Sequence, residues 1–149
     1  IKRNTKSVPS IKTLELDPKH KIKGNIAKWL DTPSAVYTKR IYYGDDVPYM
    51  LVNIYFPASR FPGLDAELAK DEPYYQWFHE HYQVNLSHSE RQMNGINLKK
   101  SDAYYLGVPE GTACYHTFVQ NYDDQGHIYE VSEVFSISEI MHFTIEQDE

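Results

Sequence analysis

The sequence predicts an α+β fold, in which helices pack against an antiparallel β-sheet within a single domain of 149 residues. Most segments with the Tyr, Ile and Val content of strands are joined by short polar turns, which connect antiparallel neighbours. Helical patterns are few and do not alternate with the strands, as the βα units of a doubly wound parallel sheet would require. These observations favour strands that pair through hairpins and helices that cover them.

The N-terminal segment differs from the rest in composition and in charge. Residues 1–24 lack a sustained period and mix lysines with Pro9 and Pro18, which predicts a linker or arm with at most short extended pieces. Residues 1–28 carry eight basic and two acidic residues, a net +6, whereas residues 29–149 carry seven basic and nineteen acidic residues, a net −12. A body of that charge repels phosphate backbones, so the basic segment is either a solvated arm or the one part that lies near DNA.

The remaining elements are predicted in the following order. The first half contains a helix at 25–30, strands at 35–43 and 49–56 around a turn at 44–46, and a helical segment at 65–82. Pro73 interrupts this last segment and is predicted to begin a new helix, with Asp71 or Glu72 as its cap. The second half contains a polar strand at 84–96, a helix at 101–106, strands at 112–122 and 127–137, and a last strand at 142–146. Gly107 is placed to end its helix in a left-handed conformation.

Alternation along two strands places charged residues among small ones. Val36, Thr38, Arg40 and Tyr42 share one face of their strand, and Glu130, Ser132, Val134 and Ser136 share one face of theirs. Such a face is either a solvated outer surface or the wall of a pocket lined by Arg40 and Glu130, suited to a small polar ligand. The pattern alone leaves both interpretations open.

Residues for metal binding or covalent catalysis lack the required spacing. His79 and His81 are two apart on a predicted helix, whereas a helical zinc pair needs a separation of four. Cys114 is the single cysteine and is better explained as a small core residue than as a nucleophile. There is no nucleophile elbow and no glycine-rich phosphate loop. The sequence therefore predicts no metal, no cofactor and no enzyme, and the lack of a signal peptide or membrane span predicts a cytoplasmic protein.

The order of several motifs resembles that of the UTRA domain over roughly residues 26–147. The motifs are Tyr37-Thr38-Lys39-Arg40-Ile41, Tyr55-Phe56-Pro57, Phe61-Pro62-Gly63-Leu64, Leu106-Gly107-Val108, Tyr122-Asp123, Gly126, Glu130 and Phe143. The resemblance implies a chorismate lyase-like fold and the effector-binding half of a bacterial GntR-type transcription regulator of the HutC subfamily. It implies a homodimer that contacts DNA only through a separate N-terminal winged helix-turn-helix domain. Residues 1–24 would then be a linker remnant and residues 25–149 the effector-binding domain.

The same resemblance implies a set of effector-binding residues. Arg40 corresponds to the first member of an Arg-x-Arg pair, and Tyr42 replaces the second. Tyr75 is retained from a Ser-Leu-Tyr motif, which here is Pro73-Tyr74-Tyr75. The implied site consists of Arg40, Tyr42, Tyr75, Glu130, Ser132 and Ser136. The effector is expected to be a small polar metabolite, with sugars and sugar phosphates among the candidates. The alternatives are a small lyase of the chorismate lyase type and a dimerisation module that binds no ligand.

Overall fold

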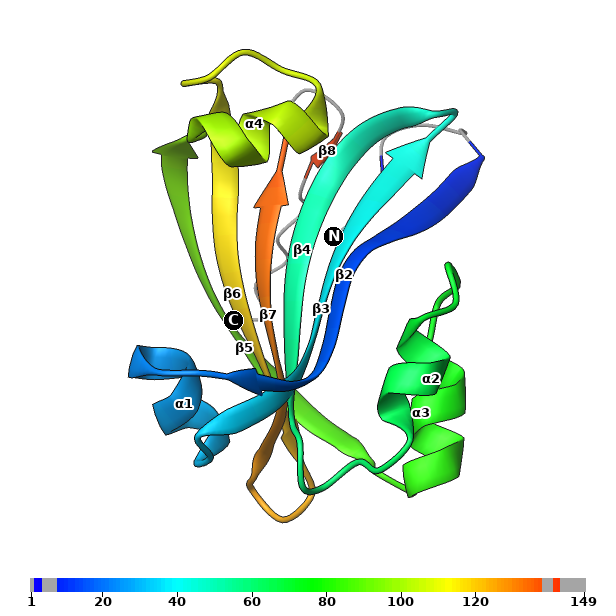
Figure 1. Cartoon of the computed structure of the whole chain (residues 1–149). Helices are drawn as coiled ribbons and strands as arrows, with labels where there is room; N and C mark the ends of the chain where they lie inside the picture. The colour runs from blue at the N-terminus through cyan, green and yellow to red at the C-terminus, as the bar shows by residue number, and fades with distance from the viewer. Residues whose placement is uncertain (1, 4–7, 138–140, 143–149) are drawn as a thin grey trace, which may run out of the picture.

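The computed structural model describes residues 2–3, 8–137 and 141–142, and it confirms the predicted α+β class (Figure 1). The elements are β1 (Lys2–Arg3), β2 (Pro9–Lys21), α1 (Gly24–Leu30), β3 (Ser34–Gly44), β4 (Val47–Pro57), α2 (Leu64–Leu68), α3 (Tyr75–Tyr82), β5 (Leu86–Asn97), α4 (Lys100–Leu106), β6 (Ala113–Asp123), β7 (Ile128–Ser136) and β8 (Met141–His142). Six strands form one antiparallel sheet in the order β2-β3-β4-β7-β6-β5, and β1 pairs separately with β8. None of the described helices is long and apolar enough to cross a membrane.

The N-terminal segment was predicted wrongly as an arm with short extended pieces. Its residues 9–21 instead form the 13-residue edge strand β2, which pairs with β3 along its length. Two register shifts, between Thr13 and Glu15 and between Asp17 and His20, break the two-residue period that would have revealed a strand. The exposed lysines of β2 also favoured the prediction of a solvated arm. Lysines are common on edge strands, however, because their charge prevents the open edge from pairing with another chain.

The hairpin between β3 and β4 forms as predicted. Its two turn residues, Asp45 and Asp46, have φ angles of 50° and 65°, which match the right-handed twist of the flanking strands. Asp45 also exchanges hydrogen bonds with the Val8 backbone: the Val8 N–H donates to the side-chain Oδ1 of Asp45 at 2.8 Å, and the Asp45 N–H donates to the Val8 carbonyl at 3.0 Å. The turn thereby fixes the start of β2 beside β3.

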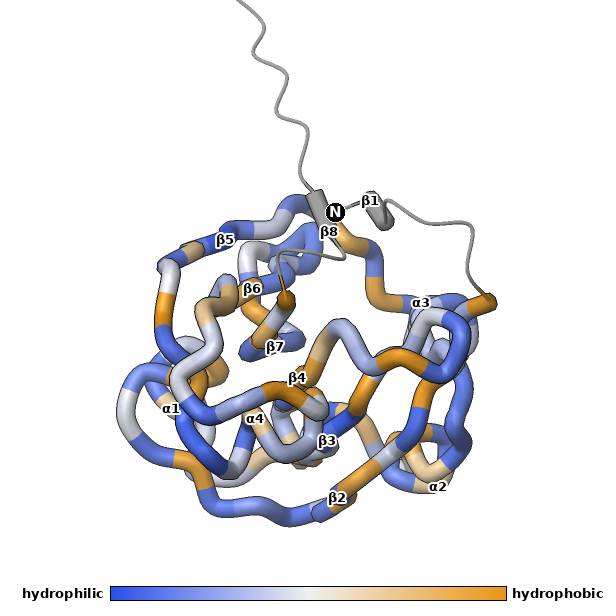
Figure 2. Tube along the Cα trace, turned by 90° about the horizontal axis from the view of Figure 1, so that it is seen from above, coloured by the Kyte–Doolittle hydropathy of each residue, from blue (hydrophilic) through white to orange (hydrophobic). Residues whose placement is uncertain are grey.

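Helices cover both faces of the sheet. The face turned to α2 and α3 carries an aromatic core that includes Phe56, Phe61 and Phe78. On the opposite face α4 packs over a cluster that includes Leu51 and Leu106, and α1 packs over a smaller one. Figures 1 and 2 show α1 on one side of the curved sheet and α2 and α3 on the other. The alternation of residues along β3, β4 and β7 therefore decides which helices each side chain meets.

The segment between α2 and α3 corrects the predicted helix restart. The second helix begins at Tyr75 instead of Pro73, and neither Asp71 nor Glu72 caps it. Asp71 instead accepts a hydrogen bond from the Thr13 N–H of β2 at 2.8 Å, which lowers the pKa of its carboxyl group. The segment is held in a non-helical path because its backbone carbonyls bind a buried arginine, as described below.

The second half of the chain follows the prediction closely. Helix α4 ends at Gly107, whose φ of 67° lies in the left-handed region. Strands β5, β6 and β7 lie within two residues of their predicted bounds. Of the last predicted strand, 142–146, only His142 is described, as part of β8, and residues 143–146 lie outside the described residues.

Candidate functional site

A pocket of ≈ 390 Å³ lies between the start of α3 and the sheet face that carries the aromatic core, and it extends to the edge strand β5. Its lining comes from five strands and the start of α3: Tyr42, Met50, Val52, Ile54, Tyr74, Tyr75, Leu86, Ser89, Arg91, Val119, Asn121, Glu130, Ser132 and Val134. The sheet residues are brought together by register, since Val52 pairs with Val134, Ile54 with Ser132, and Ser132 with Val119. Pockets of this size commonly enclose small molecules.

Glu130 is the buried centre of a hydrogen-bond network at one end of the pocket. Its side chain is 2% exposed, and it accepts hydrogen bonds from Tyr74 Oη on Oε2 and from Tyr75 Oη, at 3.3 Å, on Oε1. Asn121 Nδ2 donates to Glu130 Oε1 at 2.7 Å and to Tyr75 Oη at 2.8 Å. Ser89 Oγ on β5 donates in turn to Asn121 Oδ1 at 2.6 Å. The network thus ties α3 to three strands through one carboxyl group.

The surroundings of Glu130 control the protonation of the whole network. Burial raises the pKa of Glu130, while hydrogen bonds from Tyr74, Asn121 and Tyr75 oppose the rise because they favour the carboxylate. Burial and the negative charge of Glu130 raise the pKa of Tyr74 and Tyr75 as well. Both phenols therefore stay protonated near neutral pH and remain donors. Tyr74, Tyr75 and Asn121 fill three of the roughly four acceptor positions of the carboxylate, so at most one position is left for a ligand.

Arg40 lies next to this network and donates hydrogen bonds to backbone carbonyls at the end of α2 and in the segment between α2 and α3. Its side chain is 0% exposed; Nη1 donates to the Glu72 carbonyl at 2.7 Å, and Nη2 donates to the carbonyls of Leu68 and Lys70, both at 3.0 Å. The guanidinium carbon lies 5.2 Å from the centre of the Tyr74 ring. Nε has no hydrogen-bond partner among the described residues. Arg40 is thus next to the pocket without lining it.

The structure brings together four of the six residues expected to bind an effector. Tyr42, Tyr75, Glu130 and Ser132 line the pocket, whereas Arg40 and Ser136 are not among its lining residues. Burial, opposed by the charge of Arg40, raises the pKa of Tyr42. The interpretation of this face as a solvated surface is wrong, because Arg40, Glu130 and Ser136 are all at most 2% exposed.

Several lining residues were not anticipated from the sequence. Asn121 and Ser89 complete the Glu130 network, and Arg91 lies on the same face of β5 as Ser89. The polar strand β5 alternates only weakly, and a register shift between Leu86 and His88 hides which of its residues face the pocket. The pairing of Ser89 with Asn121 and of Arg91 with Val119 reveals it.

The other polar groups that the sequence singled out lie elsewhere. His79 Nδ1 is hydrogen-bonded to the Val84 carbonyl at 2.6 Å, and His81 stacks on Trp77. Cys114 is buried, which raises the pKa of its thiol and makes the reactive thiolate less accessible. Within the part of the chain that the structure describes, no three His, Cys, Asp or Glu side chains are grouped so that they could hold a metal ion.

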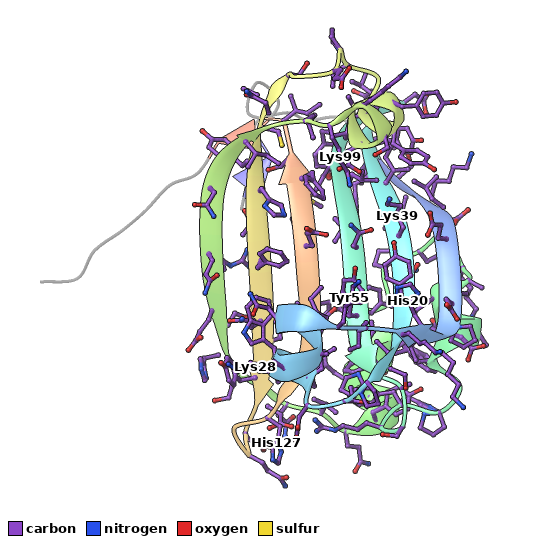
Figure 3. The ribbon with its side chains drawn as sticks, turned by 60° about the vertical axis from the view of Figure 1, so that its left-hand side comes forward. His20, Lys28, Lys39, Tyr55, Lys99 and His127 are labelled. Atoms are coloured by element: carbon purple, nitrogen blue, oxygen red, sulfur yellow. The ribbon has the colours of Figure 1, made fainter. Side chains whose placement is uncertain are left out.

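A second hydrogen-bonded chain crosses the opposite face of the sheet, the face on which Figure 3 labels His20, Lys39 and Tyr55. Tyr37 Oη donates to Asn53 Oδ1 at 2.8 Å, and Asn53 Nδ2 donates to Glu133 Oε1 at 3.0 Å. Glu133 Oε2 lies 2.8 Å from Nε2 of His116, which stacks on Phe135. The residues of this chain do not line the pocket under α3, whereas Glu130, Asn121 and Tyr75 do, so we consider the pocket at Glu130 the better candidate site.

A curved antiparallel sheet with a pocket under α3 defines the class: an α+β domain with a pocket between a helix and one face of its sheet. The sequence profile of the UTRA domain family matches residues 7–141, so the chain belongs to that family. The expected chorismate lyase-like architecture is confirmed with it. The family match begins before β2, which agrees with the inclusion of that strand in the sheet.

Solved structures of GntR-family regulators share the fold. The ligand-binding domain of a regulator from Bordetella bronchiseptica superposes with a TM-score of 0.86 at 19% identity, over 95% of this chain and 90% of that one. The C-terminal domain of Yurk from Bacillus subtilis gives 0.83 at 23% identity, over 90% and 93%. PhnF from Mycobacterium smegmatis gives 0.84 at 17% identity, over 94% of this chain but 63% of PhnF. The chain thus spans less than two thirds of this longer regulator. No curated protein sequence matches the chain.

Proposed function

We propose that this chain is the effector-binding domain of a bacterial GntR-type transcription regulator, and that a small metabolite binds in the pocket under α3. The observation that carries the proposal is the hydrogen-bond network around the buried Glu130, which lines a cavity of ≈ 390 Å³ in a domain of the UTRA family. Solved relatives that are described as a ligand-binding domain and as an effector domain support it. The proposed role is binding without catalysis.

The polar groups of the pocket suit a ligand with hydroxyl or other hydrogen-bonding groups. Tyr42, Tyr75 and Ser132 present hydroxyls that can both donate and accept, and all three line the cavity. Sugars and sugar phosphates are therefore the first class to test. Arg40 and Ser136 act in this proposal as supports, since Arg40 fixes the segment that leads into Tyr74 and Tyr75.

A chain of contacts connects the pocket to the N-terminal strand. Arg40 binds the carbonyls of Leu68, Lys70 and Glu72, and Asp71 between them accepts the Thr13 N–H of β2. Thr13 Oγ1 also donates to the Leu68 carbonyl at 3.4 Å. A ligand that moves Tyr74 or Tyr75 would therefore shift β2, which lies on the N-terminal side of the domain.

The remaining parts of the proposal concern the intact regulator. A separate N-terminal winged helix-turn-helix domain binds the operator, and the effector changes that affinity through the N-terminal segment. The regulator is a homodimer of the HutC subfamily and acts in the cytoplasm. In this proposal the linker to that domain joins the N-terminal end of the chain, where the basic charge of Lys2, Arg3 and Lys6 suits a position close to DNA.

A thermal-shift screen of this domain against sugars, sugar phosphates, amino acids and fatty acids tests the proposal. A ligand that binds only the folded state at a hundredfold excess over its Kd adds about 2.7 kcal/mol to the free energy of unfolding. Ser132→Phe fills the pocket and should abolish the shift, whereas Ser101→Phe, at an exposed position of α4, should preserve it. The proposal is overturned if no metabolite shifts the midpoint, or if the shift survives in Ser132→Phe.

A further inference from the structure

The positive charge available to a ligand in the pocket under α3 comes from an unexpected strand. Arg91 of β5 is the one Lys or Arg among the residues that line the pocket. Arg40 lies nearby, but both of its Nη atoms are bound to backbone carbonyls. At the position of the second arginine that the family resemblance implied, the chain carries Tyr42. Arg91 is thus the basic residue placed to pair with an anionic ligand in this pocket.

Arg91 is exposed and forms no ion pair with any described residue. Its neighbour Glu90 points to the opposite face of β5, where Tyr122 Oη donates to it at 3.2 Å and His88 lies 3.9 Å away. The closest carboxylate in the sequence is therefore engaged elsewhere. The guanidinium remains free to form the paired hydrogen bonds that carboxylates and phosphates accept.

The floor of the pocket beside Arg91 is apolar. Val52, Ile54, Val119 and Val134 come from three adjacent strands and lie on one face, with Met50 at the end of the row. Val119 pairs directly with Arg91 on one side and with Ser132 on the other. Branched aliphatic side chains in this arrangement favour a hydrocarbon surface on the ligand, because burial of apolar area is the main gain they offer.

The negative charge at Glu130 places an anionic ligand group at the Arg91 end. Glu130 shares a row of the sheet with Asn121 and Ser89, whereas Arg91 belongs to the next row, with Val119 and Ser132. Strand spacing and rise then separate the Cα atoms of Glu130 and Arg91 by about 12 Å. An anion at Arg91 avoids the carboxylate, and the body of the ligand spans the apolar floor toward Tyr75 and Asn121.

From these observations we infer that the effector is an amphipathic anion, with a carboxylate or phosphate paired to Arg91 and a hydrocarbon body on the apolar floor. The inference rests on the proposed function and narrows its ligand class. Both oxyanions offer the paired acceptors that the guanidinium recognises, so the charged group is defined by this shared chemistry. A sugar phosphate satisfies the charge but lacks the hydrocarbon body.

Calorimetry with matched probes tests the inference on this domain and on two variants. The probes are 3-phenylpropanoate, its neutral amide, phenyl phosphate and glucose 6-phosphate. The amide and glucose 6-phosphate are expected to bind at least about tenfold more weakly than the better of the two aromatic anions, which identifies the preferred oxyanion. Arg91→Met should weaken that anion about tenfold or more and leave the amide unchanged. Lys100→Met, which removes an exposed charge outside this pocket, should change neither.

Different results separate this inference from the proposed function. Equal binding of the amide and the carboxylate, wild-type affinity of Arg91→Met for both anions, or no binding of either anion would overturn the inference. The proposed function would survive any of these results, provided that another metabolite shifts the midpoint of the domain and Ser132→Phe abolishes that shift. The proposed function would fall if no metabolite of the wider screen shifted the midpoint, or if the shift survived in Ser132→Phe.

Discussion

Replacing Arg40 by methionine is expected to lower the free energy of unfolding by about 3–5 kcal/mol, because backbone carbonyls that the guanidinium binds would lose their donor. The change removes three hydrogen bonds to the carbonyls of Leu68, Lys70 and Glu72. The bond to Leu68 is buried, and its loss leaves that carbonyl with only the long, 3.4 Å bond from Thr13 Oγ1, a penalty of about 1–3 kcal/mol. The two part-buried bonds add about 1 kcal/mol each. Loss of the contact with the Tyr74 ring adds about 0.5–2 kcal/mol, and removal of a buried charge offsets part of the total.

Urea denaturation of wild type, Arg40→Met and Lys39→Met measures this effect at fixed pH. Lys39 precedes Arg40 on β3 and faces the opposite side of the sheet, where its Nζ lies 5.3 Å from the centre of the Tyr105 ring. Its replacement is expected to change the free energy of unfolding by less than about 1 kcal/mol. If both variants lost the same small amount, the role of Arg40 in holding the segment between α2 and α3 would be refuted.

Three further predictions follow from the geometry. Burial raises the folded-state pKa of Glu130, so the contribution of this group to the free energy of unfolding is fully present below its unfolded-state pKa and is lost as pH rises through its folded-state pKa. Glu130→Gln does not titrate, so its stability relative to wild type should increase over that pH interval. A difference in urea midpoints that does not change with pH would contradict this. Asp46→Gly should increase the free energy of unfolding by about 0.5–1 kcal/mol and so raise the thermal midpoint, because the φ of 65° at Asp46 favours glycine. A lower midpoint would count against the turn geometry. Gly107→Ala should cost about 1 kcal/mol through its φ of 67° alone, since the added Cβ meets only Pro48 Cγ, at 4.0 Å; an unchanged midpoint would argue against a left-handed stop for α4.

The parts of the fold that the sequence predicts are those governed by local rules. The hairpin of β3 and β4 follows from alternation on either side of two aspartates, and the end of α4 follows from Gly107. Strand β2 escapes such rules because its two register shifts move its side chains between faces. Its place in the sheet depends on pairing with β3, which no local pattern encodes.

The candidate site divides in the same way. Parity along β7 places Glu130 and Ser132 on one face, and both line the pocket. Parity along β3 also puts Arg40 on that face, but it does not reveal that backbone carbonyls more than 25 residues away in sequence would occupy the guanidinium. Asn121 and Arg91 could be found only from the register between β5, β6 and β7, which is a tertiary property.

The strand order has a consequence for how the domain assembles. The sheet consists of two three-stranded meanders, β2-β3-β4 and β5-β6-β7, joined along a single seam where Met50 to Tyr55 pair with Ser136 to Val131. The pocket straddles this seam, with Val52 on one side and Glu130 on the other. Contacts between distant segments carry the largest loop-closure cost and tend to form late. The pocket is therefore expected to be among the last features to form during folding. A bound ligand would contact both meanders and so slow their separation during unfolding.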